Sequence, residues 1–269
     1  LQDAIEHELA AIEQEWAPQS AAIVVVDPAS GAVVASAGAA VDEPRVLGSV
    51  LKPFTVAAAL RSGVDPDIQL PGHQGALLFE GVEVKDHTPH ETLNLTELLV
   101  TSSNIGAVAL LKEVELESLR RLLADFGLSD HIAAEGPAAE SQMMMGLGTP
   151  VTPVKLAQAY ATLWDQTGEQ PRQRLLDVDD AQLVVDALSE AVGPRGTGNR
   201  AAVAGRDVAG KTGTAITAEG DHVATFAGWW ASDEGVRAMV VVVVAPQGER
   251  TYGGRVAAPA FAHIVQATE

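Results

Sequence analysis

A serine and a lysine three residues apart stand where a helix is expected to begin. The segment Gly48-Ser49-Val50-Leu51-Lys52-Pro53-Phe54 runs into the apolar stretch 56–60, and proline is tolerated only in the first turn of a helix. A helix that begins near Ser49 places Ser49 and Lys52 on one face. The helix dipole and burial both disfavour a protonated lysine, so Lys52 could take the proton of a serine nucleophile. A plain helix cap is the competing interpretation of the same pattern.

Two further polar segments could serve the same chemistry. In Thr101-Ser102-Ser103-Asn104, between two apolar helical patterns, Ser102 could relay a proton and Asn104 could hold an amide, although two helix caps explain the segment equally well. Lys211-Thr212-Gly213-Thr214 lies on an expected strand. Its lysine and threonines offer donors to a carboxylate, and Gly213 lets a ligand approach the backbone. An edge strand could also pair with an extended peptide, but an ordinary strand with one glycine shows the same pattern.

Strand patterns at both ends of the chain flank a central region of helical patterns, and these elements must position the polar segments. The region 64–85 reads as a loop. Because strands at both ends enclose the helices, we expect an α+β fold with a helical region inserted between two blocks of strand. The expected helices are 1–16, 95–100, 116–126, 153–164, 181–192 and about 257–267, and the expected strands are 21–26, 32–36, 208–215, 223–230 and 236–245.

Composition narrows the possible partners. The chain has 269 residues with 17 basic and 36 acidic side chains, a formal net charge of −19, which disfavours binding to nucleic acid or to an anionic membrane surface. It has no cysteine, so disulfides, thiolate metal sites and a cysteine nucleophile are excluded. No apolar run approaches the roughly 18 to 20 residues of a membrane span. The start at Leu1 suggests a soluble part of a longer gene product whose membrane anchor is missing.

The three motifs together resemble a known family. Ser-x-x-Lys at Ser49, Ser-x-Asn at Ser102 and Lys-Thr-Gly at Lys211 occur in the order found in the penicillin-binding protein transpeptidase domain, which is related to the serine β-lactamases. The resemblance implies a mostly antiparallel sheet flanked by helices, plus an all-helical subdomain, with the active site between them. Segments similar to class B transpeptidases extend over nearly the whole chain: 52–55, 92–97, 102–107, 151–153, 156–162, 209–215, 252–254 and 256–259.

The resemblance also implies catalytic roles. Ser49 is expected to be the acylated nucleophile and Lys52 its general base. Ser102 and Lys211 are expected to relay a proton to the leaving group. The family usually has Pro-Gly-Ser before the nucleophile, whereas Leu47-Gly48-Ser49 stands here.

Binding roles follow from the same resemblance. Asn104 is expected to hold an amide of the substrate, and the hydroxyls of Thr212 and Thr214 its terminal carboxylate, with Gly213 leaving room between them. The backbone N–H groups of Ser49 and Thr214 are expected to form the oxyanion hole.

The implied activity is that of a serine D,D-transpeptidase acting on the D-Ala-D-Ala ends of peptidoglycan stem peptides, with β-lactams as covalent inhibitors. We expect no cofactor and no metal, no nucleic acid partner, and contact with a membrane only through an anchor absent from this chain. The location is expected to be periplasmic or otherwise extracytoplasmic. We expect a single domain over 1–269, with an α/β part at about 1–60 and 195–269 and a helical part at about 61–194.

Two other functions fit the acyl-serine motifs. One is a serine β-lactamase, in which water takes the acyl group; the Glu-x-x-Leu-Asn loop of class A enzymes has no match between Ile105 and Arg206, and Asn104 stands where class D enzymes generally carry valine. The other is a non-catalytic module that binds or senses penicillin without turnover. The persistence of the acylated protein distinguishes these functions.

Overall fold

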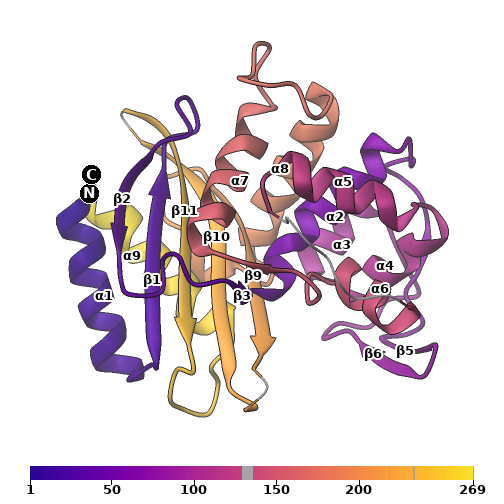
Figure 1. Cartoon of the computed structure of the whole chain (residues 1–269), viewed down its shortest axis with the longest axis horizontal. Helices are drawn as coiled ribbons and strands as arrows, with labels where there is room; N and C mark the ends of the chain where they lie inside the picture. Colours follow the sequence, from indigo (N-terminus) through magenta and orange to yellow (C-terminus); the bar gives the residue numbers. More distant parts are fainter. Residues whose placement is uncertain (129–135, 218, 233, 269) are drawn as a thin grey trace.

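A five-stranded antiparallel sheet forms the centre of the structure, a computed structural model that describes residues 1–128, 136–217, 219–232 and 234–268 (Figure 1). The strand order β2-β1-β11-β10-β9 joins strands from both chain ends, and β9 lies at one edge. This confirms the expected α+β fold with its antiparallel sheet. The strands are β1 (Ser20–Val26), β2 (Val33–Ala37), β9 (Val208–Ile216), β10 (His222–Ser232) and β11 (Gly235–Val244).

Both faces of the sheet are buried against helices. Successive side chains of a strand point to opposite faces, so Trp229 packs into one apolar cluster and its neighbour Trp230 into the other. The first face carries α7 and the second carries α1 and α9, with α1 and α9 also in contact with each other. Because both faces are covered, β1 and most of β11 are continuous apolar runs. The helices are α1 (Gln2–Trp16), α7 (Pro153–Asp165) and α9 (Gly253–Ala267).

The remaining helices gather beside the β9 edge. Helix α2 packs against α3, α5 and α8, and α8 also packs along β9, so the helical part is in direct contact with the sheet (Figure 1). In the described residues no helix is both long enough and apolar enough to cross a bilayer. The elements are α2 (Lys52–Arg61), α3 (Leu95–Thr101), α4 (Asn104–Ala109), α5 (Leu116–Asp125), α6 (Pro137–Met144), α8 (Val178–Val192), η1 (Gly48–Leu51), η2 (Leu110–Lys112) and η3 (Asn199–Ala201).

The interior of the chain is not wholly helical, and the expected loop over 64–85 is wrong. Strands β5 and β6 form a hairpin within it, joined by Glu80 and Gly81, both with positive φ. A two-residue connection of this kind is a hairpin turn, and the sequence marks it only by Gly81 between two apolar positions. The short strands are β3 (Arg45–Val46), β4 (Leu70–Pro71), β5 (Ala76–Phe79), β6 (Val82–Lys85), β7 (Thr92–Leu93) and β8 (Pro150–Val151).

The last helix begins one turn before the expected start near Ala257. It runs from Gly253 with Pro259 inside it. The first turn has to approach the sheet closely, because a Cβ at Gly253 would lie 2.3 Å from the carbonyl oxygens of Gly213 and Thr225. Glycine therefore opens the helix at this contact, which apolar periodicity alone does not indicate.

Candidate active site

Ser49 lies in the single 3-10 turn η1, which continues directly into α2. The Lys52 N–H closes this turn on the Ser49 carbonyl. Residues i and i+3 eclipse each other in a 3-10 turn, so Ser49 and Lys52 share one face, as expected from their spacing. Ser49 is partly exposed, whereas Lys52 is completely buried. A helical start near Ser49 is confirmed, with a 3-10 rather than an α-helical first turn.

Close backbone contact holds η1 against strand β9. Gly48 has φ of +77°, and a Cβ there would lie 2.7 Å from the Thr214 carbonyl oxygen. From the other side, a Cβ at Gly213 would lie 2.3 Å from the Leu47 carbonyl oxygen. Both glycines are therefore required by the approach of the two backbones. The structure thus places Ser49 beside the Lys-Thr-Gly-Thr segment of β9.

Lys52 reaches from α2 to the turn between α3 and α4. Its Nζ donates to the Ser102 carbonyl and to Asn104 Oδ1, both at 2.7 Å. Burial lowers the pKa of Lys52 to about 7, and the charge of Asp86 partly opposes this shift. A neutral amine has two N–H donors and one lone pair, so these two bonds use both donors and leave the lone pair to accept a proton. The first two motifs are thereby brought together.

Lys211 is the second fully buried lysine of the site. It lies on β9, and its Nζ donates to the Thr212 carbonyl at 3.2 Å. Burial and, to a smaller extent, repulsion by Lys52 hold the pKa of Lys211 well below its ordinary value. We call Lys52 and Lys211 the lysine pair. Because protonated Lys52 and protonated Lys211 repel each other, it is costly for both amines to carry a proton at once.

The Ser102–Asn104 turn has an unusual backbone. Helix α3 ends at Ser102 in the left-handed conformation, with φ of 59°, which costs a non-glycine residue about 1 kcal/mol. Ser103 then begins α4 by accepting from the Gly106 N–H. The side-chain amide of Asn104 donates to the Lys85 carbonyl at 2.9 Å, which directs Oδ1 to Lys52. The reversal at Ser102 is what aims its own carbonyl at Lys52.

Asp86, just after β6, holds this turn, and the sequence analysis missed it. Its carboxylate accepts from the Ser103 hydroxyl, from the Asn104 N–H and, at 3.1 Å, from the Ile105 N–H. Asp86 precedes Ser103 by only 17 residues, but it follows the hairpin that was expected to be a loop. An aspartate directly after a recognised strand could have indicated the contact.

Thr212 and Thr214 lie on the opposite face of β9 from Lys211 because strand side chains alternate. The Thr212 hydroxyl hydrogen-bonds the Thr197 hydroxyl at 2.7 Å, and Thr214 Oγ1 accepts from the Gly253 N–H at 3.1 Å. Thr197 was not singled out from the sequence, and Gly253 appeared only within the family-like segment 252–254, with no role assigned to it. Their own segments show no polar motif, and only the fold brings them to β9.

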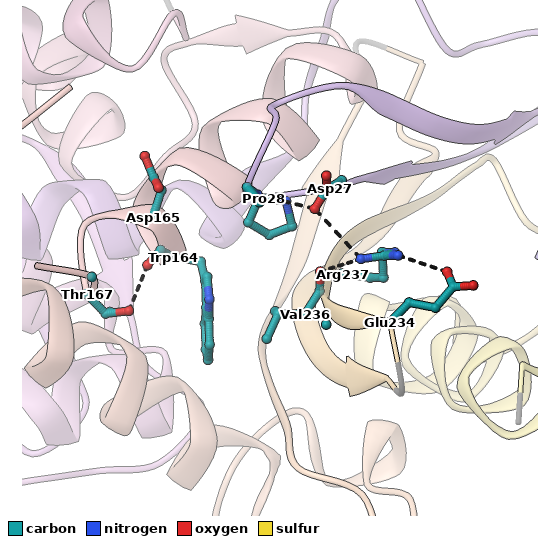
Figure 2. Close-up of a pocket in the computed structure, with 11 residues that line it drawn as sticks. Asp27, Pro28, Trp164, Asp165, Thr167, Glu234, Val236 and Arg237 are labelled. Carbon is teal, nitrogen blue, oxygen red and sulfur yellow. Dashed lines mark hydrogen bonds and ion pairs between the residues drawn. The ribbon is translucent and has the colours of Figure 1, made fainter. Parts of the chain in front are cut away.

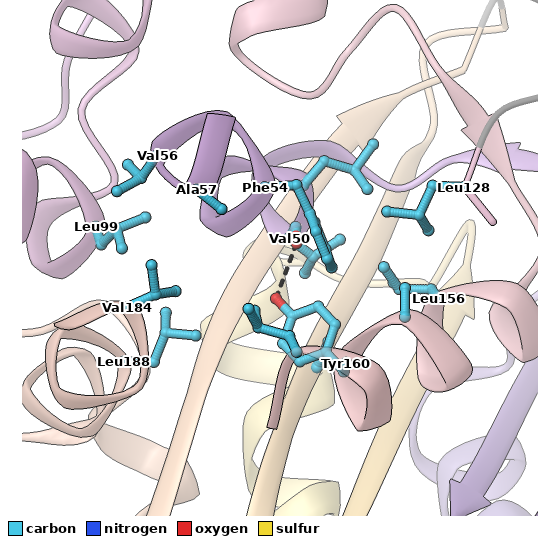
Figure 3. Close-up of a cluster of buried hydrophobic side chains, with 14 of the residues drawn as sticks. Val50, Phe54, Val56, Ala57, Leu99, Leu128, Leu156, Tyr160, Val184 and Leu188 are labelled. Carbon is cyan, nitrogen blue, oxygen red and sulfur yellow. Dashed lines mark hydrogen bonds between the residues drawn. The ribbon is translucent and has the colours of Figure 1, made fainter. Parts of the chain in front are cut away.

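A cluster of aromatic side chains packs against η1. The aromatic cluster consists of rings in contact with one another: Phe54, Phe126, Tyr160, Trp164 and Trp229. Tyr160 Oη donates to the Val50 carbonyl at 2.8 Å, as Figure 3 shows. Trp229 Nε1 donates in turn to the Tyr160 carbonyl at 2.9 Å. The buried Tyr160 hydroxyl and the buried Trp229 indole are therefore both satisfied, and the Tyr160 hydroxyl fixes the residue next to Ser49.

A cavity of about 280 Å³ lies elsewhere, between the β1–β2 turn, the β10–β11 turn and the end of α7 (Figure 2). Arg237 bridges Asp27 and Glu234 across it, at 3.7 and 3.0 Å. Asp165, also in its lining, pairs with Arg172 at 3.5 Å. Each of these charged groups thus has an oppositely charged partner, and none of the expected site residues lines the cavity. Within the described ranges no group of three or more histidine or carboxylate side chains could hold a metal ion.

Comparison with known proteins gives a consistent result. Residues 21–266 match the family described as the penicillin binding protein transpeptidase domain. Probable peptidoglycan D,D-transpeptidase PbpC of Pseudomonas aeruginosa is 29% identical over 81% of this chain and 44% of its own length, and peptidoglycan D,D-transpeptidase FtsI of Escherichia coli K12 is 28% identical over 81% and 42%. The chain thus spans less than half the length of these curated relatives. Its fold superimposes on the apo TP domain of penicillin-binding protein 3 from Burkholderia pseudomallei with a TM-score of 0.87, at 26% identity, covering 99% of this chain and 92% of that one. The chain belongs to the family of penicillin binding protein transpeptidase domains.

Proposed function

We propose that this member of the transpeptidase family is a serine D,D-transpeptidase that acts on the D-Ala-D-Ala ends of peptidoglycan stem peptides through a Ser49 acyl-enzyme. The observation that carries the proposal is the buried Lys52 amine, one 3-10 turn from Ser49, with both N–H donors engaged and a pKa of about 7. A group with a pKa near the working pH is well suited to general base catalysis.

Acylation begins when Ser49 Oγ attacks the carbonyl carbon between the two D-alanines. The Oγ–C bond forms as the Ser49 proton passes to Lys52, and the carbonyl oxygen becomes an oxyanion. The N–H groups of Ser49 and Thr214 stabilise that oxyanion; the close contact of Gly48 with Thr214 supports this placement. The C–N bond then breaks, and the terminal D-alanine leaves as an amine after receiving a proton.

Ser102 and Lys211 pass that proton to the leaving nitrogen. The lysine pair supports this role, because a proton on Lys52 and a proton on Lys211 repel each other. In the second half-reaction, an amine of an acceptor stem peptide attacks the Ser49 ester. The proton flow then reverses, the C–O bond breaks, and Ser49 is regenerated with a new amide as product.

Substrate binding uses the remaining residues of the motifs. Asn104 keeps one amide N–H to donate to the substrate, since only the other is used by Lys85. Thr212 and Thr214 bind the terminal carboxylate, and the backbone of the edge strand β9 binds an extended peptide. Gly213 serves the site by admitting η1, because its open side faces the Leu47 carbonyl rather than the peptide. The protein works outside the cytoplasmic membrane, in the periplasm or its equivalent, where these substrates lie. β-Lactams, which mimic the dipeptide, acylate Ser49.

Intact-mass spectrometry after exposure to benzylpenicillin tests the proposal. We expect one adduct of the full penicillin mass, mapped to Ser49 by peptide sequencing, and no adduct in Ser49→Ala. Ser62→Ala is the matched control, because Ser62 ends the same helix with its hydroxyl bonded to the Ala58 carbonyl. Labelling at another residue, or unchanged labelling of Ser49→Ala, contradicts the assignment.

The lifetime of the adduct distinguishes the transpeptidase from a β-lactamase. A hydrolase needs a base that activates water, and the Asp86 carboxylate near Lys52 is already occupied by three donors. We therefore expect an adduct that lasts at least minutes. Turnover of a chromogenic cephalosporin many times per second would replace the transpeptidase by a hydrolase. Transfer of a D-Ala-D-Ala substrate to an added amine separates the enzyme from a module that only binds penicillin.

A further inference from the structure

We propose that Asp86 is a positioning residue for acylation: it holds the Ser102–Asn104 turn against Lys52 and supplies the negative charge that faces this lysine. The proposal rests on the proposed function, since it concerns the rate at which Ser49 is acylated. Asp86 acts through the turn and through Lys52 and is given no contact with the substrate.

The contacts of Asp86 fall on two separate oxygens. Oδ1 accepts the N–H groups of Asn104 and Ile105, while Oδ2 accepts the hydroxyl of Ser103. Ser103 is itself buried and accepts from the Gly106 N–H at 2.8 Å. A single carboxylate thus fixes three consecutive residues at the start of α4: Asn104 and the residues on either side of it.

Two adjacent residues at the end of the hairpin, Lys85 and Asp86, each accept a hydrogen bond from Asn104. The Lys85 carbonyl takes the amide N–H of the side chain, and Asp86 takes the backbone N–H. These two hydrogen bonds hold the backbone and the side-chain amide of Asn104, and in this orientation Asn104 Oδ1 accepts from Lys52. The β5–β6 hairpin therefore serves as the support on which the base is aligned.

Asp86 also acts on Lys52 electrostatically. Among the described residues, two ionisable groups interact electrostatically with this lysine. Asp86, just after β6, raises the pKa of Lys52, and Lys211 on β9 has its own pKa lowered by repulsion from protonated Lys52. Loss of the Asp86 charge removes the only one of these two influences that favours protonated Lys52. The pKa of Lys52 then falls further below its ordinary value, and the amine becomes neutral at a lower pH.

Two substitutions separate the two effects. Asp86→Asn removes the charge, but its Oδ1 can still accept from Asn104 and Ile105, while its amide group can donate to the Ser103 hydroxyl. Asp86→Ala removes both the charge and all three hydrogen bonds. Asp27→Asn is the matched control, because Asp27 likewise accepts from a serine hydroxyl and a backbone N–H, but in the distant β1–β2 turn.

The experiment follows the rate of acylation by a fluorescent penicillin from pH 5 to 9, with folding checked by circular dichroism. For Asp86→Asn we expect the acid limb of the profile to move to lower pH, with the plateau rate within about threefold of the wild type. For Asp86→Ala we expect the same move and a plateau lower by about 10- to 100-fold, because the base and nucleophile lose their alignment. Asp27→Asn should keep the wild-type profile.

An acid limb of Asp86→Asn that coincides with the wild type overturns the proposal, and this variant decides the matter even if Asp86→Ala does not fold. A merely structural role would lower the folding stability and leave the acid limb in place. Failure of the wild-type protein to label at Ser49 is a different result, which overturns the proposed function rather than the role of Asp86.

Discussion

Two buried groups of side chains adjoin the turn that carries Ser49: the apolar aromatic cluster, through Tyr160, and the ionisable lysine pair, through Lys52. In the aromatic cluster, the Tyr160 hydroxyl and the Trp229 indole each have a partner, so burial costs little and the packing stabilises the fold. In the lysine pair, both amines are completely buried, and both pKa values are lowered. Burial stabilises the structure in the first group and creates a reactive base in the second.

The largest effect is expected from Lys52→Met, which keeps an unbranched side chain only one atom shorter and removes the base. We expect the rate of acylation to fall by about 10²- to 10⁴-fold, the range that general base catalysis contributes. The measurement is the rate of labelling by a fluorescent penicillin at pH 8. Lys112→Met, at an exposed position, should label at the wild-type rate. A loss of less than about tenfold would mean that another group takes the Ser49 proton.

The same variant tests the cost of burying the amine. Lys52 has a pKa of about 7 when folded and near 10.5 when unfolded, so between these values the unfolded chain binds more protons. The penalty is full below pH 7 and shrinks as the pH rises, so the free energy of unfolding of the wild type should rise with pH in this window. Denaturation by urea at pH 7, 8 and 9 should show a shallower rise for Lys52→Met. Parallel pH dependences would contradict the lowered pKa.

Gly48→Ala tests the contact that joins the turn to β9. Its Cβ would lie 2.7 Å from the Thr214 carbonyl oxygen at a φ of +77°, so the turn must move away from the strand. We expect acylation to slow by about 10- to 100-fold, as misplaced reacting groups generally cause. Gly127→Ala is the control, with a φ of +72° and nothing within 4 Å of the added atom. Equal acylation rates in the two variants would show that the contact does not position Ser49.

Tyr160→Phe disturbs the aromatic side of the comparison. It leaves the buried Val50 carbonyl without its 2.8 Å partner, which should lower the free energy of unfolding by about 1 to 3 kcal/mol. Acylation should slow only a few-fold, because the base is untouched. Urea denaturation and labelling kinetics measure the two effects, and Tyr252→Phe, at an exposed tyrosine, is the control. If Tyr160→Phe slowed acylation more than Lys52→Met does, the roles given to the aromatic cluster and the lysine pair would be reversed.

Thr197→Val is expected to have the smallest effect. It removes the 2.7 Å hydrogen bond that orients the Thr212 hydroxyl and keeps the branched shape of the side chain. A net cost of about 1 kcal/mol corresponds to roughly fivefold weaker binding of the substrate carboxylate. Titration of the Ser49→Ala protein with a D-Ala-D-Ala peptide, with and without Thr197→Val, measures it. Thr167→Val, which removes a hydroxyl bonded only to its own helix end, should bind as the parent does.

The sequence was sufficient for the sheet, for most helices and for the close placement of Ser49 and Lys52. Continuous apolar strands and a proline after the Ser-x-x-Lys pattern are local signals, and tertiary packing agrees with them here. The prediction failed at the β5–β6 hairpin, where half-exposed side chains and a single Gly81 give a weak signal. That error concealed Asp86.

The supporting residues of the site could not be predicted from their own segments. Thr197, Tyr160 and Gly253 act on residues 15, 110 and 39 positions away, through single hydrogen bonds. Such contacts arise only when the chain is folded, so the family-like segments 156–162 and 252–254 do not reveal these hydrogen bonds. The lowered pKa of Lys52 has the same origin, since it depends on how completely the fold removes the amine from water.

The central claim is that Ser49 is activated by a neutral Lys52. The dependence of the acylation rate on pH, measured with a fluorescent penicillin from pH 5 to 10, tests it most directly. We predict a rate that rises with pH, bends near pH 7 where Lys52 loses its proton, and stays level above. A rate that does not change with pH, or one that keeps rising until it bends near the ordinary lysine pKa of about 10.4, would contradict it.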